Sequence, residues 1–149
     1  MIPLIRCAQA LKVACYLPIV PPRGQRRLWF VKLTRPIASL DRGGRFWRRN
    51  QFGISEYHPP QRRWQRAHAL QKVFVPLLGF DAEGYRLGMG GGYYDASLAF
   101  RRWRAGQASP RVIGLGFSCQ GTLKLPHDGW DIPLDAVLTE SGLLRPRRG

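Results

Sequence analysis

The pattern of apolar and polar positions along the first half of the chain predicts a hairpin followed by irregular structure. Mixed β-branched and aromatic residues predict strands over residues 12–20 and 28–33, and the turn sequence "PPRGQRR" between them predicts that the two strands pair. The polar and basic residues 34–49 predict a loop with a short helix. The stretch "NQFGISEYHPP" predicts an irregular segment, and "QRRWQRAHAL" predicts one or two helical turns.

The second half begins with an apolar run, residues 72–80, that shows no alternation. Such a run predicts a central strand covered on both faces. A turn and a glycine-rich stretch follow, and then "YYDASLAFRRWRA" has helical spacing. We expect Tyr93, Leu98 and Trp103 to face inward on this helix, with the arginines outward.

Two more apolar segments, residues 111–118 and 135–140, predict further buried strands. Strands that alternate with a helix favour a layered α/β protein. The chain has 149 residues, of which 44% are hydrophobic, and this size suits one domain with one core. The sequence therefore predicts a single α/β domain over residues 1–149.

The net charge of +15 favours an anionic partner such as a nucleotide or a nucleic acid. Arginines supply most of this charge and are scattered along the chain, which is also typical of arginine-rich codon usage. A basic protein that binds nucleotides or nucleic acid without catalysis therefore remains an alternative, although we expect no specific nucleic-acid partner.

No apolar run reaches the roughly 18 residues that a membrane span requires, and the first residues lack the pattern of a signal peptide. We therefore expect a cytoplasmic location and no membrane partner.

Cys7, Cys15 and Cys119 form no CxxC pair, which predicts reduced thiols that act as small buried hydrophobic residues.

The stretch "YRLGMGGGYYD", residues 85–95, carries the candidate chemistry. Glycines allow the main chain to approach a ligand closely, and the backbone N–H groups of a glycine-rich turn before a helix favour phosphate. Arg86 would add a cation for phosphate oxygens, and Asp95 could hold a Mg²⁺ ion that bridges nucleotide phosphates.

Two common phosphate-binding motifs are absent from this stretch. A Walker A motif requires a lysine after its glycines, and none follows them here. The stretch "GMGGG" also does not match the dinucleotide-binding fingerprint. The alternative is a tight turn packed against a neighbouring strand, with Asp95 capping the helix or solvated.

The longer stretch "VPLLGFDAEGYRLGMGGGYYDASL", residues 75–98, resembles the signature of the 5-formyltetrahydrofolate cyclo-ligase (5,10-methenyltetrahydrofolate synthetase) family. The matching positions are Pro76, Phe80, Asp81, Gly84, Arg86, Leu87, Gly88, Gly90, Gly92, Tyr93, Tyr94 and Asp95. The flanking stretches "CYLPIV", "FGISE" and "LPHDGWDIPLDAVLTESG" are also similar to the family, except that Tyr57 replaces the family's proline.

The resemblance implies a three-layer α/β/α fold with a mixed, mostly parallel sheet. It also implies a reaction. ATP phosphorylates the formyl oxygen of 5-formyltetrahydrofolate, a neighbouring folate nitrogen attacks the activated carbon, and phosphate leaves to give 5,10-methenyltetrahydrofolate. ATP is then the co-substrate and Mg²⁺ the cofactor. The partners are ATP and the folate, with or without a polyglutamate tail, and we expect a monomer.

The resemblance also implies roles for residues of this chain. Arg86 and Asp95 resemble the catalytic pair. The resemblance assigns ATP binding to Arg86, Leu87, Gly88, Met89, Gly90, Gly91, Gly92, Tyr93 and Tyr94, and folate binding to Phe52, Met89, Gly90, Gly91, Gly92 and Tyr93. Asp95 and Asp135 resemble magnesium ligands. A strand-end turn residue is an equal alternative for Asp135, and His127 is interpreted as a loop residue.

The family pattern begins with a helix that carries a lysine and an arginine for the ATP phosphates, followed by a strand–helix unit. Only about eleven residues precede the strand over residues 12–20 here. We therefore expect a chain that lacks the family's first helix and first strand–helix unit, which makes an inactive truncated relative a second alternative.

Overall fold

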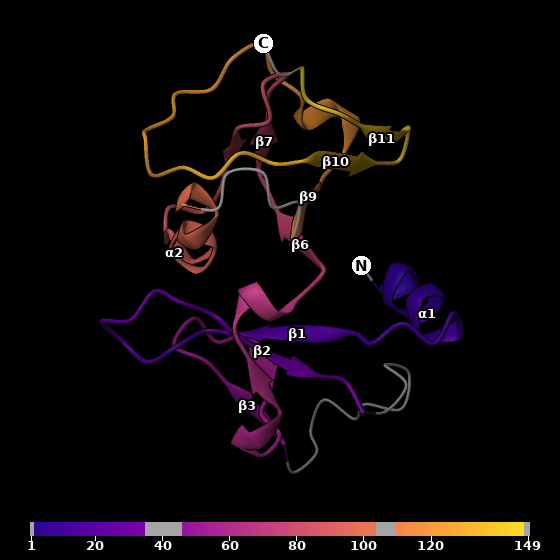
Figure 1. Cartoon of the computed structure of the whole chain (residues 1–149), viewed down its shortest axis with the longest axis vertical. Coiled ribbons are helices and arrows are strands. Elements are labelled where there is room, and N and C mark those ends of the chain that lie inside the picture. Colours follow the sequence, from indigo (N-terminus) through magenta and orange to yellow (C-terminus); the bar gives the residue numbers. More distant parts are fainter. Residues whose placement is uncertain (1, 35–45, 104–109, 148–149) are drawn as a thin grey trace. The chain divides into compact units, whose positions relative to one another are not determined.

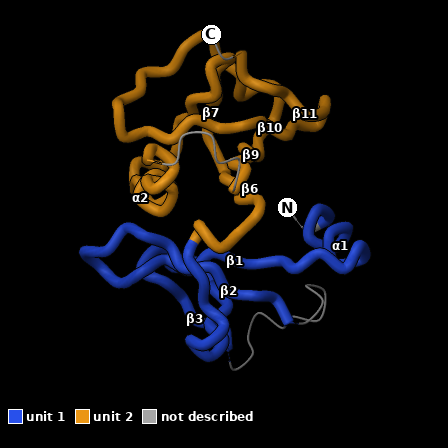
Figure 2. Tube along the Cα trace, viewed as in Figure 1, with its two compact units in different colours: residues 1–66 blue, residues 67–149 orange. Residues whose placement is uncertain are grey.

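The structure is a computed structural model that describes residues 2–34, 46–103 and 110–147. The chain divides into two compact units, which are coloured separately in Figure 2: unit 1, Met1–Arg66, and unit 2, Ala67–Gly149. Each unit has its own sheets, so each is described by itself. The sequence predicts one domain over residues 1–149. The division into two compact units does not test this prediction, which therefore stays a prediction.

Unit 1 is built from short strands that all pair antiparallel (Figure 1). Its elements are helix α1 (Ile2–Ala10), strands β1 (Tyr16–Ile19), β2 (Trp29–Lys32), β3 (Trp47–Arg49) and β4 (Ser55–Tyr57), the 3-10 helix η2 (Gln61–Arg63) and strand β5 (Trp64–Gln65). Strands β1, β2 and β5 form one sheet in that order, and β3 pairs with β4 in a second. The predicted β1–β2 hairpin is confirmed, with Tyr16 opposite Lys32 and Ile19 opposite Trp29.

Helix α1 was not predicted, and a Schellman motif terminates it. The N–H of Lys12 bonds to the carbonyl of Gln9 at 3.0 Å, and the N–H of Val13 bonds to the carbonyl of Ala8 at 2.9 Å. Lys12 has a φ of 57°, the left-handed conformation that this motif requires at the residue after the C-cap, Leu11. The chain then turns directly into the segment that leads to β1.

The core of unit 1 lies between these short sheets. Ile19, Val31, Leu33 and Tyr57 are its fully buried members. Partly buried apolar side chains pack around them, namely Ile5, Cys15, Leu17, Trp29, Trp47 and Trp64. Ile5 therefore ties helix α1 to this core.

Two predictions for unit 1 were wrong. The stretch "NQFGISEYHPP" was predicted to be irregular, but it contains strand β4, which pairs with β3 through Arg48 opposite Glu56. Strand β3 itself lies in a segment predicted as loop and short helix; the rest of that segment, residues 35–45, lies outside the described residues. The predicted helical turns of "QRRWQRAHAL" are confirmed in part, because η2 and a second 3-10 helix, η3 (Ala67–Ala69), flank strand β5.

Unit 2 contains a four-stranded sheet and a separate two-stranded hairpin. After η3, its elements are strands β6 (Lys72–Pro76), β7 (Gly79–Phe80) and β8 (Arg86–Leu87), helix α2 (Tyr93–Leu98), the 3-10 helix η4 (Ala99–Trp103), strand β9 (Arg111–Leu115), the 3-10 helix η5 (Ser118–Gln120), and strands β10 (Ala136–Thr139) and β11 (Gly142–Leu144). Strand β7 pairs with β8 outside the larger sheet.

The larger sheet has the order β11-β10-β9-β6. Strand β9 runs parallel to both β6 and β10, whereas β11 returns antiparallel to β10. The predicted α/β class with a mixed, mostly parallel sheet is confirmed. The apolar run over residues 72–80 is not one central strand, however. It breaks after Pro76, which lacks a backbone N–H, and within the described residues β6 lies at the edge of the sheet while β9 and β10 are central.

The predicted helix after the glycines is confirmed over Tyr93–Leu98 and then tightens into the 3-10 helix η4. Leu98 is fully buried, as predicted. Trp103 was predicted to face inward, but 86% of its surface is exposed. Residues five apart already lie about 140° apart around an α-helix of 3.6 residues per turn, so Trp103 does not share the face that Leu98 buries.

The three cysteines are free thiols. Cys15 is partly buried, and burial raises the pKa of its thiol. Cys7 and Cys119 are exposed, which corrects the prediction that the cysteines are buried.

Among the described helices, none has both the length and the apolar character that crossing a membrane requires.

Candidate active site

The candidate site begins with a turn that Asp81 organises between β7 and β8. One carboxylate oxygen of Asp81, Oδ1, accepts the backbone N–H groups of Glu83 at 3.0 Å and Tyr85 at 2.9 Å. The other oxygen, Oδ2, accepts the N–H of Leu125 at 3.0 Å. Asp81 is only 4% exposed. Its side chain therefore holds both the hairpin turn and the later segment that crosses it, a role that sequence reasoning did not assign.

Gly84 completes this turn in a position that excludes a side chain. Its φ is +93°, and a Cβ atom there would lie 2.8 Å from Cγ of Pro146 and 3.0 Å from the carbonyl oxygen of Leu134. The carbonyl of Gly84 in turn accepts the N–H of Leu134 at 2.8 Å. The turn is thus packed directly beneath two later segments of the chain.

Arg86, the first residue of β8, makes two hydrogen bonds away from the hairpin. Its Nη1 donates to the carbonyl of Ile132 at 2.8 Å, and its Nη2 donates to Oδ1 of Asp95 at 2.8 Å. The same Oδ1 accepts the N–H of Ile132 at 3.2 Å. The side chain of Arg86 is 6% exposed and that of Asp95 is 22% exposed. The two predicted catalytic residues are therefore brought together as a largely buried ion pair.

The glycine-rich loop connects these two residues across the surface. Residues 87–91 are exposed, and Met89 is 92% exposed. Gly90 and Gly92 have positive φ values of 79° and 63°, and a Cβ atom at Gly88 or Gly90 would meet nothing within 4 Å. The loop is thus an open stretch of main chain held at both ends by the Arg86–Asp95 pair.

Gly92 also begins helix α2, and its carbonyl accepts the N–H of Ala96 at 3.0 Å. Tyr93 and Tyr94 occupy the first turn and are partly buried. Burial raises the pKa of Tyr94 to about 12, and the positive charge of Arg86 opposes this rise. The hydroxyl of Tyr94 is therefore neutral at physiological pH.

Asp135 lies immediately before β10. Both of its oxygens accept Nη2 of Arg101 at 2.9 Å, and Oδ2 also accepts the N–H of Val112 at 2.7 Å. Val112 lies near the amino end of β9, so Asp135 marks the amino ends of the parallel strands. Ile132, which bonds to both Arg86 and Asp95, stands three residues before Asp135 in the chain.

The described residues fit a divalent cation only in part. No group of three or more His, Cys, Asp or Glu side chains is arranged to hold a metal ion among residues 2–34, 46–103 and 110–147. Asp95 directs Oδ1 to Arg86 and Ile132, so coordination would fall to Oδ2. Asp135 already directs both oxygens to donors. The magnesium roles of Asp95 and Asp135 stay predictions.

Phe52, the remaining predicted folate-binding residue, belongs to unit 1. It lies on the tight turn between β3 and β4 and is 58% exposed. Asn50 Oδ1 accepts its backbone N–H at 2.9 Å. Phe52 is therefore an aromatic side chain presented to solvent by an ordered turn.

His127 packs against the hairpin. Its ring stacks on that of Tyr85, with the centroids 3.5 Å apart and the planes at 2°. The contact joins the segment around residues 125–135 to the start of β8, which agrees with the interpretation of His127 as a loop residue. The same segment is also held by the bonds of Leu125 to Asp81 and of Ile132 to Arg86 and Asp95.

A hollow of about 670 Å³ also lies beside the turn. Its lining, which includes Phe80, Leu123 and Arg145, contains no predicted site residue.

Fold and site together define an α/β protein with an exposed glycine-rich loop that closes on a buried arginine–aspartate pair. A family comparison agrees with this description, because residues 2–140 match the model of the 5-formyltetrahydrofolate cyclo-ligase family. The chain belongs to this family.

Individual relatives and a solved structure support the assignment. The chain is 35% identical over 123 residues to the 5-formyltetrahydrofolate cyclo-ligase of Haemophilus influenzae, covering 83% of this chain and 59% of the relative. It is 36% identical over 126 residues to that of Escherichia coli, covering 85% and 63%. The NMR structure of the 5,10-methenyltetrahydrofolate synthetase of Aquifex aeolicus superposes with a TM-score of 0.67 at 30% identity, covering 99% of this chain and 65% of that one. The chain thus spans about three fifths of the length of these relatives.

Proposed function

We propose that this chain acts in the ATP-dependent conversion of 5-formyltetrahydrofolate to 5,10-methenyltetrahydrofolate, with release of ADP and phosphate. In this reaction the γ-phosphoryl group of ATP passes to the formyl oxygen, a folate nitrogen attacks the activated carbon, and the C–O bond breaks as phosphate leaves. The observation that carries the proposal is the exposed glycine-rich loop anchored by the Arg86–Asp95 pair in a chain of this family.

The loop would bind the phosphates of ATP. The open space around Gly88 and Gly90 lets phosphate oxygens reach the backbone N–H groups, which is the usual reason for a glycine-rich phosphate loop. Leu87, Met89, Gly91, Gly92, Tyr93 and Tyr94 complete the proposed ATP-binding set. Little covalent chemistry falls to the protein in phosphoryl transfer, so positioning and charge stabilisation are the main tasks of these residues.

Arg86 would supply positive charge beside the phosphates from a fixed position. Its bonds to Ile132 and Asp95 hold the guanidinium in place before the nucleotide binds, and a preorganised charge avoids reorganisation during the reaction. Asp95 would hold Mg²⁺ through Oδ2, and the bound ion would neutralise phosphate charge. We keep Asp135 as a candidate second ligand, because its proposed role follows from the family resemblance.

The folate would contact aromatic and main-chain surfaces. Phe52 offers an exposed ring, and Met89, Gly90, Gly91, Gly92 and Tyr93 are proposed to contact the folate from the loop. The substrate carries a flat pterin ring, for which aromatic faces are suitable partners. Both substrates are anionic, which agrees in sign with the net charge of +15.

The test is the rise in absorbance that accompanies methenyltetrahydrofolate formation when the purified chain is mixed with 5-formyltetrahydrofolate and Mg·ATP. Calorimetric titrations with each substrate alone accompany it. Binding of each substrate supports the proposal, and product that forms only when ATP and Mg²⁺ are both present shows that the chain is active as given. Absence of product together with absence of binding of both substrates would overturn the proposal.

A further inference from the structure

Glu56, on strand β4, is a buried carboxylate outside the glycine-rich loop. It is 7% exposed, and it is the only acidic residue within the described residues of unit 1, 2–34 and 46–66. Burying a carboxylate is unfavourable unless hydrogen bonds and opposite charges compensate. The contacts of Glu56 therefore indicate what the fold uses this carboxylate for.

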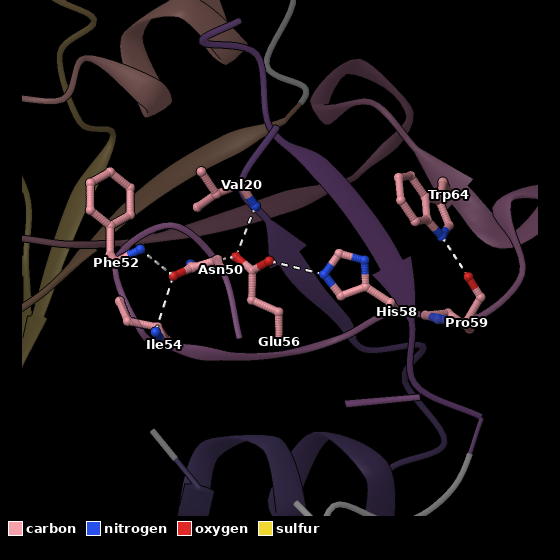
Figure 3. Close-up of polar contacts among 8 residues, drawn as sticks. All are labelled: Val20, Asn50, Phe52, Ile54, Glu56, His58, Pro59 and Trp64. Atoms are coloured by element: carbon pink, nitrogen blue, oxygen red, sulfur yellow. Dashed lines mark hydrogen bonds and ion pairs between the residues drawn. The ribbon is translucent and has the colours of Figure 1, made fainter. Parts of the chain in front are cut away.

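Three donors from three different segments meet at Glu56 (Figure 3). Oε1 accepts the backbone N–H of Val20 at 2.9 Å and Nδ2 of Asn50 at 2.9 Å, and Oε2 contacts Nε2 of His58 at 3.1 Å. Val20 directly follows β1, Asn50 directly follows β3, and His58 directly follows β4. The carboxylate thus fastens the β3–β4 turn to the end of β1.

Asn50 passes this restraint on to the turn. While its Nδ2 donates to Glu56, its Oδ1 accepts the N–H groups of Phe52 at 2.9 Å and Ile54 at 3.0 Å. The main chain adds bonds from Gly53 N–H to the Asn50 carbonyl and from Asn50 N–H to the Ile54 carbonyl. Gly53 has a φ of 73°, so the turn also depends on a residue that adopts the left-handed region without strain.

This well-bonded turn presents two large apolar side chains to solvent. Phe52 is 58% exposed and Ile54 is 60% exposed, and Figure 3 shows the ring of Phe52 pointing away from the carboxylate of Glu56. Apolar side chains held outward by a fixed backbone are typical of recognition surfaces. A chain of contacts therefore runs from Glu56 through Asn50 to a displayed aromatic ring.

We propose that Glu56 is a positioning residue for folate binding, which acts through Asn50 to fix the turn that presents Phe52 to the flat ring of the substrate. This inference rests on the proposed function, since it takes Phe52 as a folate contact. Glu56 itself does not touch the folate. A fixed turn lowers the ordering loss on binding, which is the general benefit of preorganisation.

The alternative is that Glu56 only satisfies the N–H of Val20 and braces β1. Asn50→Ala leaves the contacts of Glu56 with Val20 and His58 in place, but it removes the link to Glu56 together with the bonds from Asn50 to the N–H groups of Phe52 and Ile54. Asn50→Asp separates the two readings, because it keeps an acceptor oxygen for those two N–H groups and replaces only the donor to Glu56. Faster exchange in both variants supports the link to Glu56, whereas faster exchange in Asn50→Ala alone supports the bracing role. His58→Gln is the matched control, because it alters the contact at Oε2 and leaves the Asn50 link intact. Glu56→Gln keeps an acceptor oxygen at the same position and serves as the conservative rescue.

The experiment has two readouts on the full chain: amide hydrogen exchange at Phe52 and Ile54 by NMR, and the Kd of 5-formyltetrahydrofolate and of Mg·ATP by calorimetry. We expect Asn50→Ala to speed exchange of both amides and to raise the folate Kd about tenfold while the Mg·ATP Kd stays within twofold. We expect Glu56→Gln and His58→Gln to stay within about threefold of the parent chain for all values.

Unchanged exchange and an unchanged folate Kd in Asn50→Ala would overturn the positioning role. Exchange at Phe52 and Ile54 as fast in the parent chain as in an unstructured peptide would do the same. Phe52→Ala tests the proposed function separately. If this variant binds folate as tightly as the parent, the folate contact at Phe52 is wrong, and the exchange data still decide whether Glu56 fixes the turn.

Discussion

Arg86 and Asp95 stand nine residues apart in the chain and meet at 2.8 Å, with the glycine-rich loop between them. Both residues also bond to the backbone of Ile132, Arg86 to its carbonyl and Asp95 to its N–H. The base of the loop is therefore closed by one ion pair and one peptide segment. Changes at either charged residue act on this base as well as on any ligand.

Asp95→Asn separates these two roles. Asparagine keeps an oxygen that accepts a hydrogen bond from Arg86, but it lacks the negative charge. We therefore expect the free energy of unfolding to fall by about 1–2 kcal/mol. If Asp95 also holds Mg²⁺, ATP turnover should fall to background at every Mg²⁺ concentration. Urea unfolding and a turnover assay across Mg²⁺ concentrations measure the two effects. Turnover equal to the parent chain at limiting Mg²⁺ would rule out the metal role.

Asp135→Asn is the companion to that variant, because Asp135 also pairs with an arginine, Arg101. We expect a similar decrease in stability from the weakened ion pair. A shift of the Mg²⁺ dependence in this variant would support Asp135 as a second ligand. An unchanged dependence would rule out a metal role for Asp135.

Gly92→Ala tests whether the loop backbone binds phosphate. The φ of Gly92 is +63°, where alanine is strained by about 1–2 kcal/mol, so we expect some loss of stability together with an ATP Kd raised at least tenfold. Gly24→Ala is the control, since Gly24 has a φ of +87°, nothing within 4 Å, and a position in unit 1. Gly24→Ala should lower the free energy of unfolding through the same backbone strain, but it should leave the ATP Kd unchanged. An unchanged ATP Kd in Gly92→Ala would favour the simple tight turn.

Gly84→Ala should destabilise the chain strongly. The added Cβ would lie 2.8 Å from Pro146 Cγ, and the φ of +93° is unfavourable for alanine. Strain and overpacking together predict a loss of about 2–5 kcal/mol in the free energy of unfolding. Gly88→Ala, where a Cβ meets nothing within 4 Å, should change it by less than about 1 kcal/mol. Equal stabilities of the two variants would contradict the packing described for the turn.

Tyr94 predicts a pH dependence of stability in the alkaline range. Burial raises its pKa from 10.0 to about 12, so the folded chain keeps the proton after the unfolded chain has lost it. The stabilisation is complete below pH 10 and is lost as the pH rises towards 12, by up to about 2–3 kcal/mol. Urea unfolding of the parent and of Tyr94→Phe at pH 9 and pH 11 measures this. The variant should lose less stability between the two pH values, and identical losses would count against the burial of this hydroxyl.

Binding of nucleic acid should be weak and independent of sequence. Contacts made through scattered arginines are mainly electrostatic, so the affinity for a random DNA duplex should fall by about a hundredfold or more between 50 and 200 mM salt. Fluorescence anisotropy with two unrelated duplexes measures both the salt slope and the sequence preference. A sequence-specific complex that persists at physiological salt would instead support a nucleic-acid-binding function.

Local patterns predicted the β1–β2 hairpin, the helix at Tyr93 and the strands at β9 and β10, because each of these elements carries its own apolar periodicity. Strand β4 was missed because its sequence, Ser-Glu-Tyr, has no such pattern. Its position depends on Glu56, whose partners Val20 and Asn50 come from other segments. A pattern of single residues along the chain does not contain such contacts.

The candidate loop was recognised from its glycines and from the family resemblance, whereas its support was not. Arg86 and Asp95 were both interpreted as residues that face ligands, and no local pattern indicates that they bind each other. Asp81 and Gly84 were noted only as matching positions, although they form the turn itself. Long-range contacts with Leu125, Ile132 and Pro146 give these residues their roles, and hydrophobic patterning does not report such contacts.

The turn at Asp81 depends on residues that lie 40 or more positions further along the chain. Leu125 bonds to its carboxylate, Leu134 bonds to Gly84, and the N–H of Arg147 bonds to the carbonyl of Ala82. These partners are synthesised after the hairpin, so the turn gains their bonds only once residues 125–147 have left the ribosome. The contacts of Glu56, by contrast, involve only residues 20–58 and can form while the rest of the chain is still being made. The order of translation therefore sets the order in which the two regions mature, with the glycine-rich loop as the late one.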